Sequence, residues 1–378
     1  MPLKASGKSA NVLSITSTIK KTQEVMASPL PKLTMKAIEA AAPNAAKELN
    51  GRVPILLVDK RVHSLWSEAI DTAPVFAGAQ QLLLPIGEAS KTLPTVETTL
   101  RSLARMGATR NDNYIAAIGG GSLLDSAGFI ASVFHRGLPI VHFPTTLLAM
   151  MDATLGGKNG VNFLGNKNQV GSFYLPSLSV LDFAFMDTLA EEHLRNGLIE
   201  ATKMAFLAGP KELDALTGEI PKVLALDKDA IEKAVIQALR IKSSYIGDDM
   251  YDQGKRRHLN FGHTAGHSIE ANYGGRIAHG DAVASGMLIA LEISRELGML
   301  SKGTEVALAD ALAACGFQLQ QVIDPTHLAH LLWGTIGTDK KVTQGRVVFV
   351  LPRAPGKVEL VQVGMETFTA AVLRVFES

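Results

Sequence analysis

The sequence predicts an α/β protein in two parts: a Rossmann-like parallel-sheet domain over residues 1–184 and a mostly helical domain over residues 185–378. Two observations predict this fold class. In the first half, short apolar runs alternate with longer amphipathic stretches, as in the repeated βα units of a parallel sheet. From about Asp187 onward, the pattern changes to long helical segments. The length of 378 residues suits two domains of ordinary size.

Apolar runs in the first half predict the strands of the sheet. They cover residues 53–58, 114–118 and 138–143, and each is short enough to be a buried strand. Residues 95–105 predict a helix that ends at Gly107, a residue typical of helix C-termini. Ligands of such sheets bind beyond the carboxyl ends of the strands, so the residues that follow each run are the candidates for a site.

The second half predicts helices over residues 191–207, 228–246, 264–273 and 281–297. Between the two parts lies a segment, residues 156–171, that is rich in Gly, Asn and Lys. This composition is typical of an ordered functional loop or of a hinge between domains.

Composition excludes several classes of protein. The formal net charge is +1, so no strong field attracts nucleic acid or an anionic membrane surface. Cys315 is the single cysteine, which rules out an intrachain disulfide and fits a reducing cytoplasm. No apolar run reaches the length of about 18 residues that a membrane helix needs, and the N-terminal segment lacks the apolar stretch of a secretory signal. We expect a cytoplasmic protein.

A glycine-rich turn is the first candidate site. Gly119, Gly120, Gly121 and Ser122 follow a predicted strand and precede a predicted helix, where backbone N–H groups approach a pyrophosphate. Asp59 ends an earlier strand, in the place where a carboxylate accepts hydrogen bonds from a ribose. Two plainer readings stay open: the glycines form a bare turn, and Asp59 caps a helix.

A group of histidines is the second candidate site. His263 and His267 are four residues apart and share one face of a helix, and His279 follows at sixteen residues from His263. Glu200 is the best further metal ligand, because it lies in an otherwise apolar helix with Lys203 three residues on. Chance clustering of the histidines and a simple Glu200–Lys203 ion pair are the alternatives.

Cationic and amide side chains form a third group, which suits the capture of a phosphate or a carboxylate. Taken singly, each cation is more simply explained as a solvated surface side chain. The members are Arg136, Lys158, Lys167, Asn168, Lys242, Lys255, Arg256, Lys340 and Lys341.

These pieces together resemble the sugar phosphate cyclases, and most closely their 3-dehydroquinate synthase branch. The resemblance spans nearly the whole chain. It is carried by residues 85–91, 119–125, 144–148, 156–160 and 260–267, of which the last two segments are the most specific. It implies a phosphate-eliminating carbon–oxygen lyase in which NAD oxidises a ring alcohol, phosphate leaves, the hydride returns and an aldol closure forms the carbocycle.

The resemblance also implies roles for single residues around a metal, usually zinc or cobalt. Its ligands would be Glu200, His263 and His279. The side chains that handle the substrate's hydroxyls would be Asp152, Lys203 and Lys242. The substrate's carboxylate would be received by Arg256, supported by Asp252 and Asn260.

Phosphate, cofactor and partner-subunit roles follow in the same way. The phosphate pocket would be Lys158, Asn168, His267 and one of Lys340 or Lys341, with Lys167 beside it. The NAD site would be Asp59, Glu88, Lys91, Gly119, Gly120, Gly121, Ser122, Asp125, Thr145 and Thr146. Arg136 is similar to an arginine that a neighbouring subunit contributes, which implies a homodimer acting on a small phosphorylated seven-carbon sugar.

Some positions depart from the pattern of the branch. Asn159 stands where Thr is usual. Arg61, two residues after Asp59, stands where a neutral residue is usual. A nearby Arg can accept the 2′-phosphate of NADP, so Arg61 bears on the choice between NAD and NADP. Residues 193–198 and 160–163 look more like 2-epi-5-epi-valiolone synthase, a relative that cyclises sedoheptulose 7-phosphate.

Two site positions favour the dehydroquinate branch. Asn260 and His267 keep that branch's identity, and both are usually changed in the sedoheptulose relatives. We therefore expect 3-deoxy-arabino-heptulosonate 7-phosphate as the substrate. The alternatives are the sedoheptulose sugar, a metal-dependent glycerol or alcohol dehydrogenase, and a metabolite-binding regulator that kept only the fold.

Overall fold

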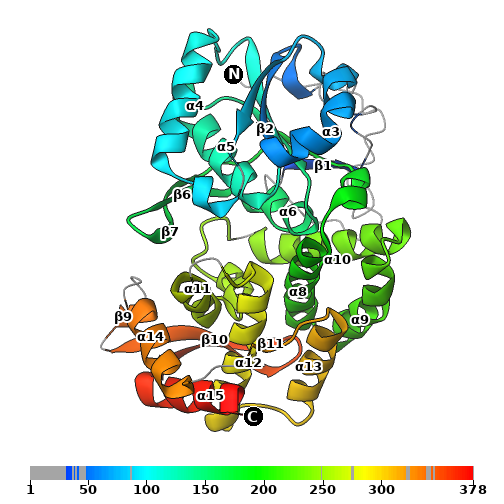
Figure 1. Cartoon of the computed structure of the whole chain (residues 1–378). Coiled ribbons are helices and arrows are strands. Elements are labelled where there is room, and N and C mark those ends of the chain that lie inside the picture. The colour runs from blue at the N-terminus through cyan, green and yellow to red at the C-terminus, as the bar shows by residue number, and fades with distance from the viewer. Residues whose placement is uncertain are drawn as a thin grey trace, which may run out of the picture. The chain divides into compact units, whose positions relative to one another are not determined.

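The structure is a computed structural model that divides into two compact units (Figure 1). It describes residues 31–35, 38, 41, 48–85, 87–247, 249–273, 276–320, 324–337, 342–343 and 345–377. The first unit is Met1–Pro144 with Gly157–Ala184, and the second is Thr145–Gly156 with Phe185–Ser378. Domains at 1–184 and 185–378 remain a prediction, and residues 145–156 group with the second unit.

A six-stranded parallel sheet forms the centre of the first unit. Its strands, in spatial order, are β1 (Lys32–Met35), β8 (Leu178–Leu181), β5 (Ile140–Pro144), β4 (Asn113–Gly119), β2 (Val53–Asp59) and β3 (Gln80–Leu84). From Tyr114 to Gly119, β4 is fully buried, as expected for a strand covered on both faces. The predicted parallel sheet is confirmed, and the strand expected from residue 138 begins at Ile140.

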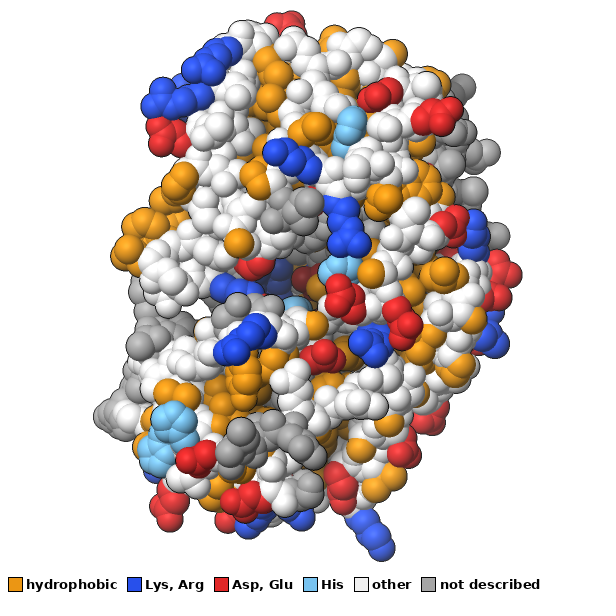
Figure 2. All heavy atoms as spheres, viewed as in Figure 1, with side chains coloured by type: hydrophobic (Ala, Val, Ile, Leu, Met, Phe, Trp, Pro, Cys, Tyr) orange, Lys and Arg blue, Asp and Glu red, His pale blue; other side chains and the backbone are white. Residues whose placement is uncertain are grey.

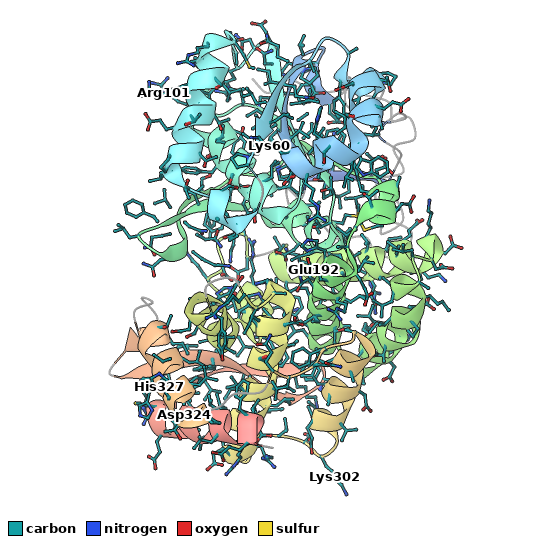
Figure 3. All side chains as sticks on the ribbon, in the orientation of Figure 1. Lys60, Arg101, Glu192, Lys302, Asp324 and His327 are labelled. Atoms are coloured by element: carbon teal, nitrogen blue, oxygen red, sulfur yellow. The ribbon has the colours of Figure 1, made fainter. Side chains whose placement is uncertain are left out.

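Helices follow the strands of this sheet, and the helix predicted over residues 95–105 is α4 (Leu93–Arg105). The other helices are α3 (Lys60–Thr72) and α5 (Gly121–Val133), with short 3-10 helices η2 (Pro74–Phe76), η3 (Glu88–Ser90) and η4 (Phe134–Arg136). The hydroxyl of Thr92 caps α4 by accepting a hydrogen bond from the backbone of Thr95. In Figure 3, Arg101 projects outward from α4, as expected for an exposed cation.

The Gly-, Asn- and Lys-rich segment forms a β-hairpin. Its strands are β6 (Lys158–Phe163) and β7 (Asn166–Phe173), paired antiparallel. The connecting Leu164 and Gly165 have φ of 49° and 80°, the left-handed values of a tight hairpin turn. The segment is therefore an ordered hairpin of the first unit.

The second unit is mostly helical, as predicted. Its helices are α6 (Leu147–Met151), α7 (Ala153–Gly156), α8 (Glu191–Ala208), α9 (Pro210–Leu224), α10 (Lys228–Ile246), η6 (Lys255–Asn260), α11 (His263–Asn272), α12 (His279–Glu296), α13 (Thr304–Ala314), α14 (Pro325–Gly337) and α15 (Met365–Glu377); η5 (Phe183–Thr188) lies where the chain passes between units. A three-stranded antiparallel sheet was not predicted: β9 (Val342–Thr343), β10 (Arg346–Ala354) and β11 (Lys357–Gly364).

Close packing of α11 against α12 sets the geometry of the candidate site. A Cβ on Gly286 would lie 2.0 Å from the carbonyl oxygen of Gly262, and one on Gly266 would lie 2.9 Å from that of Ala282. Only glycine permits this approach. The two helices therefore lie in contact close to their N-termini, where their first residues are His263 and His279.

Surface charge agrees with the near-zero net charge. On the face drawn in Figure 2, acidic and basic side chains are interspersed over the described residues. Glu192 and Lys302 are exposed charges of opposite sign, and Lys302 projects outward in Figure 3. None of the helices in the described ranges is long and apolar enough to cross a bilayer.

Candidate active site

Three side chains from three helices of the second unit converge on one point. Glu200 lies in the middle of α8 and is 2% exposed. Its Oε1 is 3.5 Å from Nε2 of His263 and 3.6 Å from Nε2 of His279. One ligand atom from each of the three residues lies within 4.8 Å of the others. The predicted trio is therefore brought together.

The donor set fits a divalent metal ion. Oε1 of Glu200 is buried and has no hydrogen-bond partner among the described residues, a costly state that a cation would relieve. Nδ1 of His263 faces the carbonyl oxygen of Phe261 at 3.2 Å, and Nδ1 of His279 faces Oε2 of Glu270 at 3.3 Å. With Nδ1 protonated, each Nε2 presents a lone pair toward Glu200. Three such ligands leave positions open, as in catalytic zinc sites.

Charges around the trio shift the pKa values in different directions. Burial would raise the pKa of Glu200, but Lys203, with Nζ 2.6 Å from Oε2, and the imidazoles hold it well below its usual range. Burial and Lys203 push the pKa of His263 well below its usual value. Burial opposes protonation of His279, but Glu200 and Glu270 raise its pKa to about 9. A metal would therefore displace a proton from His279 on binding.

A second ion pair lies beside the trio. Nζ of Lys242, which is buried on α10, donates to both the side-chain and the backbone oxygen of Asp152. Burial lowers the pKa of Lys242, while Asp152 counteracts it. Partial desolvation at the site would raise the pKa of Asp152, but Lys242 and then Lys203 lower it. The side chain of Asp152 is 53% exposed, so its carboxylate is open to a ligand.

Arg256 lies next to Lys242. It is 3% exposed and donates from its guanidinium to the carbonyl oxygens of Met250 and, at 2.6 Å, Gly156. A Cβ on Gly156 would lie 3.3 Å from Nη2 of Arg256 and 3.6 Å from Nζ of Lys242. The two cations therefore meet at Gly156, and glycine leaves the space beside them open. Burial lowers the pKa of Arg256, while Asp252 raises it.

His267 joins the same cluster. Its ring centroid is 5.1 Å from that of His263 and 6.0 Å from that of His279. Asn260 ends the 3-10 helix η6 that carries Arg256. The structure thus places the predicted hydroxyl-handling and carboxylate-binding side chains in the same unit as the trio; their roles stay predictions.

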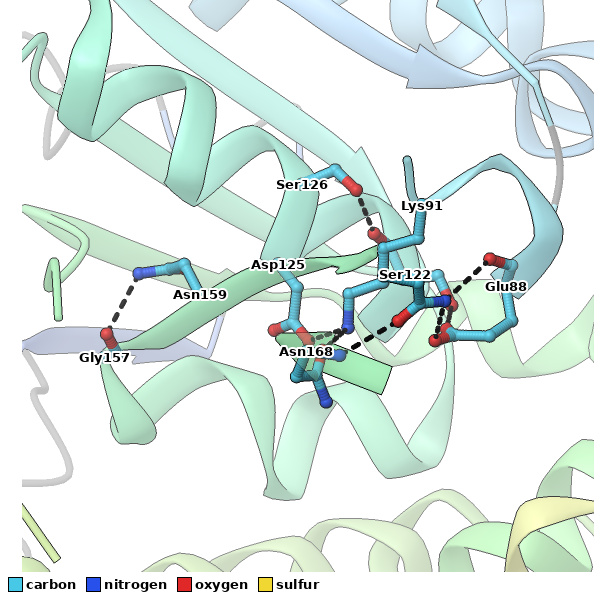
Figure 4. A network of polar contacts seen from close by, with 9 residues as sticks. Glu88, Lys91, Ser122, Asp125, Ser126, Gly157, Asn159 and Asn168 are labelled. Atoms are coloured by element: carbon cyan, nitrogen blue, oxygen red, sulfur yellow. Dashed lines mark hydrogen bonds and ion pairs between the residues drawn. The ribbon is translucent and has the colours of Figure 1, made fainter. Parts of the chain in front are cut away.

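Polar residues of the first unit form a connected network (Figure 4). Oγ of Ser122 donates to Oε2 of Glu88 at 2.6 Å. Nζ of Lys91, which is 3% exposed, lies 2.6 Å from Oδ2 of Asp125 and 2.5 Å from Oδ1 of Asn168. Burial would raise the pKa of Glu88, but Lys91 and its hydrogen bonds lower it. The network joins the loop at residues 87–91, the start of α5 and the hairpin.

At the glycine-rich turn, α5 begins immediately after Gly120, so the free N–H groups of its first turn lie at the end of β4. A Cβ on Gly119 would lie 3.3 Å from Cβ of Asp59, so glycine allows β4 and β2 to end side by side. Oδ1 of Asp59 accepts from the backbone of Arg61 at 2.7 Å and caps α3. The helix-cap interpretation of Asp59 is thus observed, and its ribose role stays a prediction.

The remaining predicted residues belong partly to the first unit and partly to the second. Thr146 caps α6 by accepting from the backbone of Ala149 at 3.1 Å, and Thr145 is buried beside it, so both group with the second unit. Lys158 begins β6 and is exposed, whereas Lys167 in β7 is half-buried. Arg136 is exposed with a φ of 62°, and Lys340 and Lys341 lie outside the described residues.

Two functional candidates were missed. Glu270 contacts His279 from α11, and its position seven residues after His263 puts it on the same helix face, a signal that the sequence contains. Asn162 donates to Oε1 of Glu88 at 2.9 Å and accepts from the backbone of Asn168 at 3.0 Å. No periodicity marks it, because its partner Glu88 comes from a separate loop.

A parallel sheet with a glycine-rich turn and a helical unit with a three-residue metal-type site define a class of two-unit enzymes that includes the sugar phosphate cyclases. The chain belongs to the 3-dehydroquinate synthase family. Residues 81–196 match the family's N-terminal part and residues 197–342 its C-terminal part. This confirms the family expected from the sequence.

Individual relatives agree. The chain is 36% identical over 312 residues to 3-dehydroquinate synthase of Symbiobacterium thermophilum, covering 81% of this chain and 86% of that protein. A solved structure of 2-epi-5-epi-valiolone synthase from Streptomyces hygroscopicus subsp. jinggangensis 5008, with NAD+ and Zn2+ bound, is 28% identical with a TM-score of 0.80, covering 94% of this chain and 98% of that one. A 2-deoxy-scyllo-inosose synthase, 24% identical over 90% of this chain and 96% of that one, shares the fold with a TM-score of 0.82.

Proposed function

We propose that the chain is an NAD- and divalent-metal-dependent 3-dehydroquinate synthase. It converts 3-deoxy-arabino-heptulosonate 7-phosphate to 3-dehydroquinate and phosphate, a step of the shikimate pathway. The observation that carries the proposal is the meeting of two buried cations, Lys242 and Arg256, at Gly156. Asp152 forms an ion pair with Lys242, and the negative charge of Glu200 acts to raise the pKa of Asp152. Asp152 therefore connects the two cations to the trio. This arrangement suits a substrate with a carboxylate at one end and hydroxyls near a metal.

Each residue class has a defined task in this proposal. Glu200, His263 and His279 would hold zinc or cobalt. When bound, the metal would polarise the substrate's oxygens and NAD would accept and return a hydride. Lys203 keeps Glu200 ionised. The open carboxylate of Asp152 accepts hydrogen bonds from substrate hydroxyls, and the cations orient the carboxylate.

The hairpin of the first unit contains side chains that we assign to phosphate departure, and His267 of the second unit is a further candidate. Lys158, Lys167 and Asn168 belong to the hairpin, and the network of Glu88 and Lys91 holds Asn168 in place. A departing phosphate needs cations and N–H donors, because charge accumulates on its oxygens as the C–O bond breaks. We propose that these side chains bind the substrate's phosphate.

Sedoheptulose 7-phosphate is the second candidate substrate. The structural similarity to the valiolone synthase favours it, at 28% identity over nearly the whole chain. This sugar has no carboxylate, so the charge-assisted contacts that Lys242 and Arg256 would make with a substrate anion would be lost. Family membership and the two cations together favour the heptulosonate.

We further propose a homodimer in the cytoplasm that acts on a small molecule, without nucleic acid or membrane as partners. The exposed Arg136, held with a left-handed φ of 62° at the end of η4, would reach the site of the partner subunit. A single cysteine supports a reducing compartment. The near-zero net charge supports a small-molecule partner.

Phosphate release measured together with NADH absorbance tests the proposal. The metal-loaded enzyme with NAD should release one phosphate per heptulosonate 7-phosphate consumed and accumulate no NADH, because the cofactor is regenerated in each cycle. The carbocyclic product is identified by mass spectrometry. Steady NADH formation with glycerol or a simple alcohol, and no phosphate release from either sugar phosphate, would instead make the protein a dehydrogenase.

A further inference from the structure

We propose that Glu270 is a positioning residue for the metal ligand His279, accepting a hydrogen bond from its Nδ1 and so fixing Nε2 toward the metal. This inference rests on the metal site of the proposed function. Oε2 of Glu270 lies 3.3 Å from Nδ1 of His279, on the side of the ring opposite to Glu200, whose Oε1 lies 3.6 Å from Nε2. The imidazole is therefore held between two carboxylates.

Burial of the Glu270 carboxylate favours a close donor such as His279. Glu270 is 9% exposed, and a carboxylate removed from water needs a donor or a cation close to it. It lies on α11 and His279 is the first residue of α12, so the contact also ties the ligand to the helix that carries His263. Metal-bound histidines commonly donate the second ring N–H to a carboxylate, which fixes the tautomer and raises the basicity of the ligating nitrogen.

The imidazoles of His263 and His279 differ in their Nδ1 partner and in how tightly packing restrains them, and Glu270 contacts the less restrained one. Nδ1 of His263 faces a neutral backbone carbonyl, that of Phe261, and the side chain of His263 is 15% exposed. The side chain of His279 is 30% exposed, so packing restrains it less. A charged acceptor supplies the restraint that packing does not. The same carboxylate also helps to raise the pKa of His279.

Glu270 could instead serve only to hold α11 against α12. A purely structural contact would alter the unfolding temperature of the metal-free protein and leave metal affinity and ligand geometry unchanged. A positioning role alters metal affinity and geometry even where the metal-free protein is as stable as the wild type. A metal titration therefore distinguishes the structural role from the positioning role.

The test compares Glu270→Ala and Glu270→Gln with the wild type and with the control Glu292→Gln, a carboxylate of α12 that pairs with Arg295. Metal-free full-length proteins are titrated with Co2+ and with Zn2+ against a competing chelator, and the visible spectrum of the Co2+ forms is recorded. We expect Glu270→Ala to raise the metal Kd by about 10–100-fold and to shift the Co2+ bands. Glu270→Gln, which keeps an acceptor but loses the charge, should recover only part of the affinity and keep a Kd more than about twofold above that of the wild type. The control should match the wild type.

Two results would overturn the inference in distinguishable ways. If the wild type binds one metal per chain and both Glu270 variants keep its Kd within about twofold and its Co2+ spectrum, the positioning role is wrong while the proposed function stands. If the wild type binds no metal at the trio, the proposed metal site and this inference both fail. Should Glu270→Ala not fold, Glu270→Gln with an unchanged Kd and spectrum is the contradicting result.

Discussion

Gly128 and Asn159 share one small space in the first unit. A Cβ on Gly128, in the middle of α5, would lie 1.9 Å from Oδ1 of Asn159 on β6. Nδ2 of Asn159 donates to the carbonyl oxygens of Gly157 at 2.9 Å and Tyr174 at 2.7 Å, which closes the base of the hairpin. Figure 4 shows the first of these bonds. The Asn that departs from the usual Thr at this position is therefore accommodated by a glycine on the facing helix.

We predict that Gly128→Ala destabilises the protein by about 1–3 kcal/mol through overpacking, although alanine is the better helix former. Gly128→Ala combined with Asn159→Thr should recover most of this loss, because the shorter side chain leaves room for the methyl group. The matched control is Gly218→Ala in α9, where an added Cβ meets nothing within 4 Å and stability should stay equal or rise slightly. Urea unfolding of the wild type and these three variants measures the effects. Equal stability of Gly128→Ala and the control would contradict the prediction.

The buried thiol of Cys315 should be unreactive in the folded protein. Burial raises its pKa to about 11, while a hydrogen bond with Thr202 opposes the shift. At pH 8 the thiol is neutral and inaccessible, so iodoacetamide should label it only after unfolding. Because the folded-state pKa is the higher one, the contribution of this group to stability should decrease as the pH rises from about 9 to 11. Rapid labelling of the native protein at pH 8 would show that the thiol is exposed.

Removing the carboxylate of the metal trio should remove the metal. Glu200→Gln leaves the trio without its anionic ligand and leaves Lys203, which is buried, without its counter-charge. We expect the bound zinc or cobalt to fall from one per chain to near zero, and the stability to fall by about 3–5 kcal/mol. Glu296→Gln, an exposed carboxylate paired with Arg374, is the control. Metal content after dialysis and thermal unfolding measure both effects, and a full complement of metal in Glu200→Gln would refute the ligand assignment.

Asn162 should stabilise the hairpin and the phosphate pocket that we assign to it. Asn162→Ala removes its bonds to Glu88 and to the backbone of Asn168, which has a left-handed φ of 52°. We expect a stability loss of about 1–3 kcal/mol and a rise in KM for the sugar phosphate that exceeds the fall in kcat. Asn166→Ala, at the exposed turn of the same hairpin, should leave both unchanged. An unchanged KM in Asn162→Ala would show that these hydrogen bonds do not contribute to substrate binding.

Much of the fold could be predicted because the apolar runs are short, strong and separated by amphipathic stretches. The strands at 53–58 and 114–118 follow from this pattern alone. The hairpin at 158–173 was interpreted as a loop or hinge, since its Gly and Asn residues obscure the alternation of a strand. The C-terminal sheet was missed because β10 and β11 follow a long run of helices, although Pro355 and Gly356 between them are a local turn signal for a hairpin.

The candidate site was predicted unevenly for similar reasons. The clustering of His263, His267 and His279 and the apolar helix around Glu200 made these residues candidates. The resemblance implied Glu200, His263 and His279 as the ligand set, and the structure brings these three together. Asn162 was missed because its partner Glu88 lies 74 residues away in the chain, a distance that no spacing rule covers.

Substrate choice tests the central claim most directly. The measurement is kcat/KM of the wild type for 3-deoxy-arabino-heptulosonate 7-phosphate and for sedoheptulose 7-phosphate, repeated with Arg256→Lys. Charge-assisted contacts contribute about 1.5–3 kcal/mol each, so the wild type should prefer the heptulosonate by at least about tenfold. Arg256→Lys should reduce that preference, because lysine cannot reproduce the donor geometry toward Met250, Gly156 and a carboxylate. Equal or better use of sedoheptulose 7-phosphate by the wild type, with Arg256→Lys unchanged, would contradict the dehydroquinate synthase assignment and favour the cyclitol synthase.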